Sequence, residues 1–469
     1  MTTQQVDVAI IGAGTAGLYA LREVKRAGKS FVLIDHGPLG TTCARVGCMP
    51  SKAALHAAEL WTMRQQQAEY GVEGTQKLSL NQDKAWAKVR EMRDGFAHGA
   101  ANNATKAAGE HLIMGRAHFL KPTLLEVKTE DDTHYIKAKS VVIAVGSRPV
   151  IPGFLSPYQE QLITTDTLFD LKQLPKRLGV LGLGAIGLEM GLALHRLGVE
   201  VVGADMAESI AGIDDPEVSE LALQNFKHSF PMHLGAPAEL SQEGKTLYLQ
   251  TQEAKIAVDK VLVALGRRPN IDKLNLAEAG FSLDDRGMPK FDPHSLQIED
   301  YPVYIAGDAN SYRTLLHEAA AEGAIAGFNA AHDHAQPFKR KTALAIAFTQ
   351  PDIISVGQRL SELAPAHTII GTARTSTNGR SRILTDAEGI LRIYADKTRA
   401  TILGASMIGA RAEHVAQFLA LAIDNELTIY ELLAAPFYHP VVEETIQSAL
   451  QDIARQLEPS PYPLGSQPQ

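Results

Sequence analysis

The amino-acid sequence predicts an α/β fold with two Rossmann-like dinucleotide-binding domains, followed by a C-terminal α+β domain. Two observations support this prediction. A pattern of strand, glycine-rich turn, helix and second strand occurs twice, once at the N-terminus and once near residue 180. After residue 342 the pattern changes to alternating strands followed by helices. The 469 residues also suit about three domains of roughly 150 residues each.

The first unit begins with a buried strand at residues 6–11. A GxGxxG turn, a helix to about residue 27 and a second strand at residues 30–34 follow, with these landmarks: Gly12, Gly14, Gly17 and Asp35. The glycines permit a tight turn and the close approach of a pyrophosphate, and the helix N-terminus faces its negative charge. The acid at the end of the second strand accepts hydrogen bonds from ribose hydroxyls.

The second unit repeats this order. Its first strand covers residues 178–181, its helix runs to about residue 197, and its second strand covers residues 199–204, with these landmarks: Gly182, Gly184, Gly187 and Asp205. In both units the acid lies 23 positions after the first glycine. No arginine lies close to Asp205, and an acid there favours NAD over NADP because it repels a 2′-phosphate. Two units therefore predict two dinucleotides.

The chain has only two cysteines, Cys43 and Cys48, and random placement would bring two this close in about 2% of chains. A structural disulfide is a weak explanation, because closing a five-residue loop removes little entropy from the unfolded chain and so stabilises the fold little. A metal site needs more ligands than two cysteines supply, so no metal is expected. A redox pair is the better interpretation. The pair lies eight residues beyond Asp35, so we expect the first unit to hold a flavin, which can exchange electrons with a disulfide.

The local pattern supports a catalytic bridge. In a regular helix, residues i and i+5 lie roughly 8.6 Å apart, too far for a disulfide, so the backbone between the cysteines must be irregular. Gly47 supplies that freedom, and Pro50 suits the first turn of a helix that begins just after Cys48. A helix N-terminus at this position would lower the pKa of the Cys48 thiol.

The remaining segments divide around these units. Residues 51–108 predict two long helices, and residues 141–147, 261–267 and 303–308 predict buried strands ending in turns. The third of these strands leads into an alanine-rich helix over residues 315–331. Beyond residue 342, strands are expected at residues 389–394 and 401–408, then helices and a disordered tail.

Charge and hydropathy exclude several classes of function. The net charge of −8 argues against a nucleic-acid partner, which requires concentrated positive charge. The apolar runs are the length of strands and far too short to span a membrane. The N-terminus runs directly into a strand, without the basic and apolar regions of a signal peptide. We therefore expect a cytoplasmic protein without a membrane segment.

Together these motifs resemble the flavin-dependent pyridine nucleotide-disulfide oxidoreductases, and among them the dihydrolipoamide dehydrogenases most. The resemblance extends over nearly the whole chain and follows its order. It rests on these segments: residues 12–17 with Asp35, residues 40–52 around the cysteines, residues 144–149, 182–189, 266–270, 306–308 and 317–323, and the stretch His439-Pro440-Val441-Val442-Glu443-Glu444.

The resemblance implies a role for each matching residue. Cys43 would exchange with the substrate, and Cys48 would face the flavin and form a charge-transfer thiolate. Lys52 would lie near the flavin's reactive edge, paired with Glu189. The residues implied in FAD binding are Gly12, Gly14, Gly17, Asp35, Thr42, Lys52, Ala144, Gly146, Asp308 and His317. Those implied in NAD binding are Gly182, Gly184, Gly187, Asp205 and Gly266.

His439, oriented by Glu444, would be the acid/base. A dithiol must lose a proton before it attacks a bridge, and histidine titrates near neutral pH. A lone histidine among the sixteen in this chain would more often be a surface or core residue, but this one lies in a His-Pro motif with a glutamate five residues on. In this family the base reaches the redox pair of the other subunit, so the resemblance implies a homodimer.

The domains implied are an FAD-binding domain at residues 1–150, an NAD-binding domain at 151–272, a central segment completing the FAD site at 273–341, a dimerisation domain at 342–458 and a disordered tail at 459–469. The expected activity is oxidation of dihydrolipoamide, or of lipoyl groups on a separate lipoyl-bearing or complex-core chain, with NAD⁺. The electrons would pass from the substrate dithiol through the Cys43–Cys48 bridge and FAD.

Two departures from the family pattern put lipoamide itself in question. The usual Gly-Gly before Thr-Cys is Gly40-Thr41 here, and the usual Ala before His-Pro is Tyr438. One alternative is therefore an NADH-dependent reductase of another disulfide, a quinone or a metal ion. Another is a docking subunit of a larger acyl-transferring complex. Mercuric reductases and high-molecular-weight thioredoxin reductases are excluded, because they need C-terminal cysteines or selenocysteine and no cysteine follows Cys48.

Overall fold

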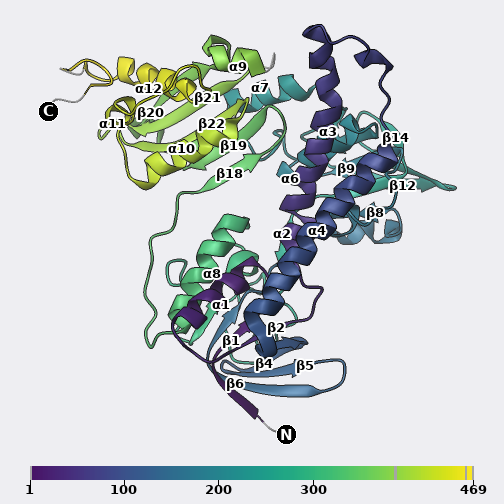
Figure 1. Ribbon diagram of the computed structural model, residues 1–469, viewed down its shortest axis with the longest axis vertical. Helices are drawn as coiled ribbons and strands as arrows, with labels where there is room; N and C mark the ends of the chain where they lie inside the picture. The colour runs from purple at the N-terminus through teal and green to yellow at the C-terminus, as the bar shows by residue number, and fades with distance from the viewer. Residues whose placement is uncertain (1–2, 385–387, 460–461, 467–469) are drawn as a thin grey trace.

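A mostly parallel sheet of seven strands organises the N-terminal part of the computed structural model, which describes residues 3–384, 388–459 and 462–466 (Figure 1). The strand order is β3-β2-β1-β6-β5-β4, with β17 paired to β6. The strands are β1 (Thr3–Ile11), β2 (Phe31–Asp35), β3 (Leu112–Met114), β4 (Arg116–Lys121), β5 (Leu124–Lys128), β6 (Thr133–Ile143) and β17 (Val303–Ile305). Strand β17, which lies 160 residues after β6 in the sequence, therefore completes the first sheet.

Helices α1 (Thr15–Arg26) and α8 (Leu316–Ala330) pack against each other in this domain. Their backbones approach closely because α8 has glycines at the contact. A Cβ on Gly323 would lie 2.1 Å from the Ala16 carbonyl oxygen, and one on Gly327 would lie 2.4 Å from that of Ala20. No side chain fits in that space, so these glycines set the distance between the two helices.

The second domain has a five-stranded parallel sheet in the order β11-β10-β9-β15-β8. Its strands are β8 (Leu162–Ile163), β9 (Arg177–Leu181), β10 (Glu200–Ala204), β11 (Met232–His233) and β15 (Lys260–Val263). Its helices are α5 (Thr165–Leu168), α6 (Ala185–Arg196) and α7 (Pro216–Phe226). A separate antiparallel sheet follows, made of β12 (Glu239–Glu243), β13 (Thr246–Gln250) and β14 (Lys255–Val258). Where the chain leaves the first domain and returns, β7 (Ser147–Pro149) pairs with β16 (Arg267–Pro269).

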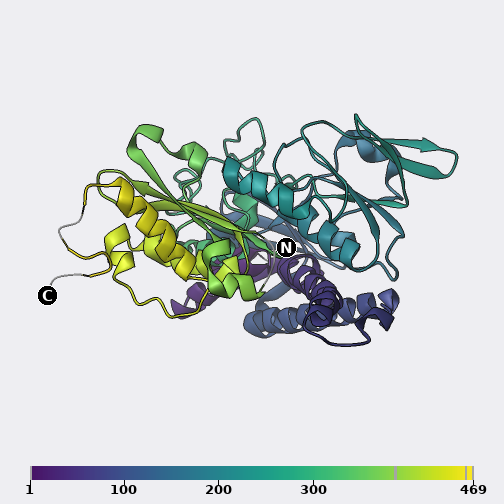
Figure 2. The ribbon, with the colours of Figure 1, turned by 90° about the horizontal axis from the view of Figure 1, so that it is seen from above.

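The third domain is an antiparallel five-stranded sheet in the order β18-β19-β22-β21-β20. Its strands are β18 (Leu344–Ala347), β19 (Asp352–Gly357), β20 (Thr368–Arg374), β21 (Ile390–Asp396) and β22 (Ile402–Gly409). Its helices are α9 (Gly379–Leu384), α10 (Ala412–Asp424), α11 (Ile429–Leu433) and α12 (Glu444–Gln456). Helix α12 buries Ile446, Ala449, Leu450 and Ile453, whose spacing puts them on one face toward the sheet. Figure 2 shows this domain at the left and most of the second domain at the right, and the two meet where α7 packs on β21 and β22.

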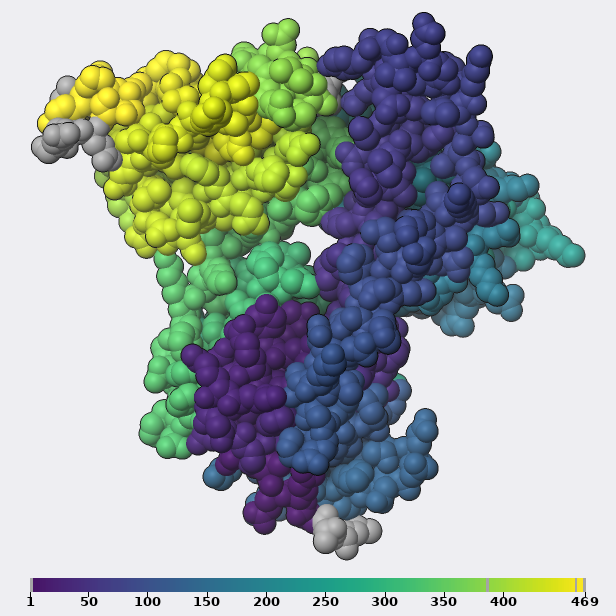
Figure 3. Space-filling view, viewed as in Figure 1, coloured from purple at the N-terminus to yellow at the C-terminus, as the bar shows by residue number. Residues whose placement is uncertain are grey.

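Two long helices rise beside the sheets: α3 (Cys48–Glu69) and α4 (Gln82–Ala108), with the short helix α2 (Thr42–Val46) at their base. In Figure 3 their upper parts form the purple and blue column that faces the yellow C-terminal domain. Helix α3 contacts α4 and also α6 of the second domain. The segment that carries the cysteines therefore lies where the first two domains meet.

The predicted fold class is confirmed, and most helices and strands expected from the motifs lie within a few residues of their predicted ends; the exception is the strand predicted at residues 141–147, which is the end of the longer β6 (Thr133–Ile143). The sequence analysis did not predict β3 to β5 or β12 to β14, which are short strands with at most two buried residues each. The predicted disordered tail lies partly outside the described residues; residues 463–466 form a turn. Within the described ranges, none of the helices has the length and apolarity needed to cross a bilayer.

Candidate active site

The two glycine turns have the same geometry. Gly12 has φ +109°, and a Cβ there would lie 2.2 Å from the Ala144 carbonyl oxygen; Gly182 has φ +91°, and its Cβ would lie 2.5 Å from that of Ala264. Gly17 and Gly187 repeat this match, since a Cβ on either would lie 1.8 Å from the carbonyl oxygen of the first glycine of its motif. The middle glycines, Gly14 and Gly184, face open space at the helix N-termini. That space is where a dinucleotide pyrophosphate would approach.

The two acids also act alike. Asp35 Oδ2 accepts a hydrogen bond from the Ala13 amide at 2.7 Å, and Oδ1 accepts one from Gly37 at 2.7 Å. Asp205 Oδ2 accepts from Leu183 at 2.5 Å, and Oδ1 accepts from Ala207 at 2.9 Å. Each carboxylate therefore joins the glycine turn to the end of the neighbouring strand. Both carboxylates lie at the C-terminal ends of their strands, where a ribose would bind.

A cleft of about 800 Å³ opens over the first glycine turn. Among the FAD residues implied by the resemblance, it is lined by Gly12, Gly14, Asp35, Thr42, Ala144 and Gly146. Its glycine cradle, free helix N-terminus and acid fit the pyrophosphate and ribose of FAD. Arg45 lines the same cleft and was missed by the sequence reasoning, because a single arginine between two cysteines matches no motif.

The other implied FAD residues lie outside the lining of this cleft. Asp308, in the turn after β17, accepts a hydrogen bond from Ser147 Oγ at 2.6 Å, and Arg267 Nε donates to the same Ser147 oxygen at 2.8 Å. Gly17 is buried in the first helix, where it contacts the turn. His317 lies in the first turn of α8 with much of its surface exposed. The part of its imidazole that is shielded from water has its charged form disfavoured, which lowers its pKa.

Gly266, implied in NAD binding, follows β15 with φ +94°, and its carbonyl oxygen accepts a hydrogen bond from the Val150 amide at 3.0 Å. It therefore stands at the point where the chain returns to the first domain. Ala264, two residues earlier, is the residue that a Cβ on Gly182 would strike. The second glycine turn and the returning chain are thus in direct contact.

Cys43 lies on α2, and Cys48 is the first residue of α3. The helices are separated at Gly47, where a Cβ would lie 3.1 Å from the Thr42 carbonyl oxygen. Both cysteines are free, and the two thiols are hydrogen-bonded to each other. The backbone break that the spacing predicted is therefore present, and it brings the two sulfurs together.

The dithiol is electrostatically polarised. The hydrogen bond from Cys43 lowers the pKa of Cys48 to about 7, against the effect of burial; the α3 N-terminal backbone and the Lys52 charge also lower it, whereas the Glu189 charge raises it. The same hydrogen bond, with burial, raises the pKa of Cys43 far above its ordinary value. Near neutral pH the proton therefore stays on Cys43, and Cys48 is the thiol that ionises more readily.

The predicted Lys52–Glu189 pair is present. Lys52 Nζ donates to Glu189 Oε2 at 2.6 Å, across 137 positions of the sequence. Glu189 is buried on α6, and its second oxygen, Oε1, accepts from the Phe348 amide at 2.9 Å. Phe348 was not among the residues expected from the sequence. Residues of three domains therefore meet at the Glu189 carboxylate. Its partner Lys52 lies one turn of α3 after Cys48.

His439 and Glu444 are also together. Nδ1 of His439 lies 2.9 Å from Glu444 Oε1, and Glu444 Oε2 accepts from the Val441 amide at 3.1 Å. The hydrogen bond to His439 lowers the pKa of Glu444. The His439 side chain is 79% exposed, and no hydrogen bond or ion pair among the described residues joins it to the dithiol of its own chain. Its imidazole is thus oriented and free to meet another molecule.

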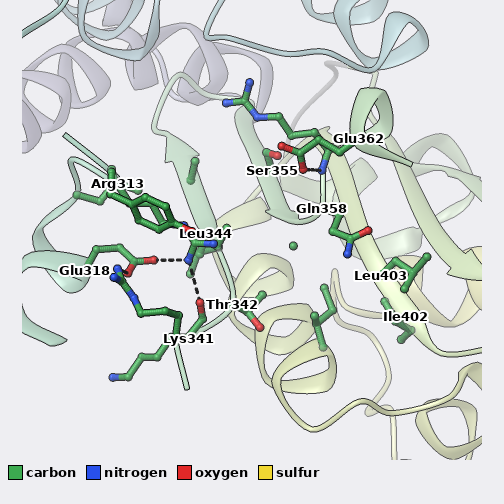
Figure 4. A pocket seen from close by; sticks show the side chains of 18 of the residues that line it. Arg313, Glu318, Lys341, Thr342, Leu344, Ser355, Gln358, Glu362, Ile402 and Leu403 are labelled. Carbon is green, nitrogen blue, oxygen red and sulfur yellow. Dashed lines mark hydrogen bonds and ion pairs between the residues drawn. The ribbon is translucent and has the colours of Figure 1, made fainter. Parts of the chain in front are cut away.

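A second cavity, of about 780 Å³, lies between the start of α8 and the third domain (Figure 4). Its wall contains a network of ion pairs. Arg313 and Arg340 both donate to Glu318 at 3.0 Å, and Arg340 also donates to the buried Glu322 at 2.5 Å. These contacts hold α8 to the segment that connects it with β18.

Comparison with known proteins identifies the family. Residues 6–323 match the family described as pyridine nucleotide-disulphide oxidoreductase, and residues 344–450 match its dimerisation domain. A dihydrolipoyl dehydrogenase of Thermus scotoductus is 30% identical over 465 residues, covering 96% of this chain and 98% of that protein. One from Staphylococcus aureus is 29% identical over 457 residues, covering 95% and 96%.

Solved structures show the same fold. LpdA from Mycobacterium tuberculosis superimposes with a TM-score of 0.84 at 22% identity, and the copper(II) complex of the HOCl-induced flavoprotein disulfide reductase RclA from Escherichia coli with 0.83 at 21% identity. Each comparison covers 96% of this chain and 99% of the other. With the family matched over both its parts, this chain belongs to the pyridine nucleotide-disulphide oxidoreductases and is a flavoprotein oxidoreductase that uses FAD and NAD(H).

Proposed function

We propose that this enzyme oxidises a dithiol of the dihydrolipoyl type with NAD⁺, through a Cys43–Cys48 redox disulfide. The observation that supports it best is the pair of adjacent thiols beside the Lys52–Glu189 ion pair, in which the pKa of Cys43 is raised and that of Cys48 is lowered. The relatives named dihydrolipoyl dehydrogenase favour this dithiol class. When bound, FAD accepts the electron pair from the dithiol and delivers it to NAD⁺ as a hydride.

The cysteines exchange electrons with the substrate in two displacements. One substrate thiolate attacks Cys43 Sγ, forming a mixed disulfide and breaking the bond to Cys48, which leaves as a thiolate. The second substrate sulfur displaces Cys43 Sγ, so the substrate becomes a disulfide and the protein pair gains two electrons. Lys52 stabilises the leaving thiolate, because its charge favours the ionised form of Cys48.

The proton from the substrate needs an acceptor. We assign this role to the partner subunit's His439, with Glu444 holding its ring, because His439 is exposed and has no polar contact with the dithiol of its own chain. The matched dimerisation domain supports a homodimer, whose two-fold axis would pair each dithiol with the other chain's base. The domain boundaries, the FAD and NAD contacts of each residue and a cytoplasmic location stay predictions.

Titration with NADH tests the proposal. Reduction of the purified holoenzyme by one NADH per active site should produce a long-wavelength absorbance band from the Cys48 thiolate and the oxidised flavin. The Cys43→Ser variant should show this band without any reductant, since its Cys48 has no bridging partner. The Cys48→Ser variant should never show it. A wild-type enzyme without the band would sink the proposed mechanism.

A second candidate is an NADH-dependent reductase of another disulfide, a quinone or a metal ion. It is favoured by Tyr438, a large and 79% exposed side chain beside His439, where the family pattern has alanine. Steady-state rates with dihydrolipoamide and with quinones separate the two. Quinone reduction that survives in Cys43→Ser, in an enzyme that never turns over dihydrolipoamide, would favour this candidate. Turnover of dihydrolipoamide by the isolated dimer would exclude a purely docking role.

A further inference from the structure

The segment that follows β18 contacts the ion pair beside the dithiol. Figure 1 shows α3, α6 and β18 meeting near the upper middle of the molecule. The Phe348 amide donates to Glu189 Oε1 at 2.9 Å, while Lys52 donates to Oε2 at 2.6 Å. Each oxygen of this buried carboxylate therefore has one partner, and the two partners come from different domains.

The Phe348 ring makes a second contact with the same ion pair. Lys52 Nζ lies 4.3 Å from the ring centroid, within the range of a cation–π interaction. The ammonium is thus held from two sides, by a carboxylate and by an aromatic face. Because Lys52 is one helical turn after Cys48 on α3, both side chains lie on one face of the helix.

Helix α6 also fixes the backbone on which Phe348 stands. Arg196 lies two turns after Glu189 on α6, and it donates to the Thr349 carbonyl oxygen at 3.0 Å and to that of Gln350 at 3.1 Å. Residues 348–350 are therefore held along α6 at both ends. These contacts fix the position of the backbone from which the ring projects toward Lys52.

We propose that Phe348 is a positioning residue for the redox centre: its ring and its backbone amide together hold the Lys52–Glu189 pair so that the ammonium stays beside Cys48. This inference rests on the proposed function. It adds a residue that neither the glycine motifs nor the cysteine motif indicates.

The charges around Cys48 set the direction of the expected effect. The titratable groups that act on Cys48 are Cys43 on α2, Lys52 on α3 and Glu189 on α6; the Lys52 charge favours the thiolate and the Glu189 charge opposes it. Without the ring, Lys52 loses one contact, whereas Glu189 keeps the amide of residue 348. The attraction between Lys52 and the Cys48 thiolate therefore weakens more than the repulsion between Glu189 and that thiolate, and the pKa of Cys48 should rise.

The test is a pH titration of the long-wavelength band in the NADH-reduced holoenzyme. Phe348→Leu should move the midpoint upward by at most about 0.5 pH unit, which is the full strength of a partly exposed cation–π contact. Phe348→Tyr keeps the aromatic face and should return the midpoint to the wild-type value. Phe338→Leu is the matched control, because Phe338 is also half-buried and its ring contacts Phe328 instead.

The possible outcomes separate this inference from the proposed function. A wild-type band that titrates normally, with the same midpoint in Phe348→Leu, overturns the role of Phe348 alone. An upward shift of equal size in Phe338→Leu also overturns it, because the effect would then be general loosening. A wild-type enzyme without any band overturns the proposed function first. If Phe348→Leu does not fold, the milder Phe348→Met, which removes the ring and keeps the volume, gives the same comparison.

Discussion

At the scale of single residues, Thr41 stands in a backbone conformation that suits glycine. Its φ is +57° and its ψ is 148°, a region that β-branched residues rarely occupy. Its hydroxyl oxygen accepts a hydrogen bond from the Ala44 amide at 3.2 Å and so caps α2. The backbone conformation therefore explains why the family pattern has glycine at this position. Thr41 is strained here, but its side chain caps the helix that carries Cys43.

Replacing Thr41 by glycine should stabilise the protein. Relief of strain of about 1–3 kcal/mol should exceed the roughly 0.4–1 kcal/mol lost through a more flexible unfolded chain. The loss of the cap to glycine costs only a few tenths of a kcal/mol. We expect the unfolding free energy to rise by about 0.5–1 kcal/mol, measured by urea denaturation.

Thr41→Ala is the control for this change. It removes the hydroxyl but keeps a Cβ in the strained conformation, so it should lower stability. A destabilised Thr41→Gly would mean that the cap outweighs the strain.

At the scale of elements, β19 and α10 meet through two acids. Asp352 begins β19 and is buried, and its carboxyl is hydrogen-bonded to Glu413 in the first turn of α10. Burial, and then this bond, raise the pKa of Asp352 to about 9. The pKa of Glu413 is lowered. The two carboxyls thus share one proton at neutral pH, and that proton joins the sheet to the helix.

The acid pair predicts a slope of stability with pH. Because the folded-state pKa of Asp352 lies above its unfolded value, its stabilising contribution is complete below the unfolded value near 4 and is lost as the pH rises toward 9. Between these limits the folded state binds one more proton, so the unfolding free energy should fall by at most about 1.4 kcal/mol per pH unit. The opposite effect of Glu413 acts only below its ordinary value near 4.5.

Asp352→Asn keeps a hydrogen bond to Glu413 and cannot titrate. Urea unfolding at pH 6 and pH 8 should show a smaller difference for this variant than for wild type. Asp300→Asn, at an exposed aspartate, should leave the wild-type difference unchanged. An unaltered pH slope in Asp352→Asn would contradict the shared proton.

At the scale of the whole molecule, buried polar contacts lock the second domain to the third. Asp215, fully buried at the N-terminus of α7, accepts hydrogen bonds from Arg392 Nε at 2.8 Å and from the Tyr394 hydroxyl at 2.7 Å, both on β21. Arg392 also pairs with Glu217. These contacts and the Lys52–Glu189 pair join all three domains of the chain, and we propose that the exposed His439 serves the dithiol of the partner subunit.

Mixed dimers test this arrangement. A Cys43→Ser subunit combined with a His439→Ala subunit contains one site with both changes and one site with neither, if the base comes from the partner. Differently tagged subunits, co-expressed and purified as the heterodimer, should therefore recover about half of the wild-type rate with dihydrolipoamide. Each homodimer should be strongly impaired. A heterodimer no faster than the mean of the two homodimers would place both residues in the same chain's site.

Features that depend on residues close together in the chain could be predicted from the sequence alone. In each GxGxxG turn a Cβ on the third glycine would strike the carbonyl oxygen of the first, and the acid ends the strand that follows, so Gly12 with Asp35 and Gly182 with Asp205 could be predicted from one chain. The cysteine spacing likewise predicted the backbone break at Gly47. These are short-range constraints of geometry.

Contacts between residues far apart in the sequence depend on how the domains pack. Glu189 binds Lys52 across 137 positions and the Phe348 amide across 159, and Arg392 reaches Asp215 across 177. A phenylalanine, an arginine and an aspartate of this kind carry no local signal, because their partners are chosen by how the sheets pack. The family pattern suggested the contact between Lys52 and Glu189. It did not suggest Phe348, whose amide reaches Glu189 only because the third domain packs against the first two.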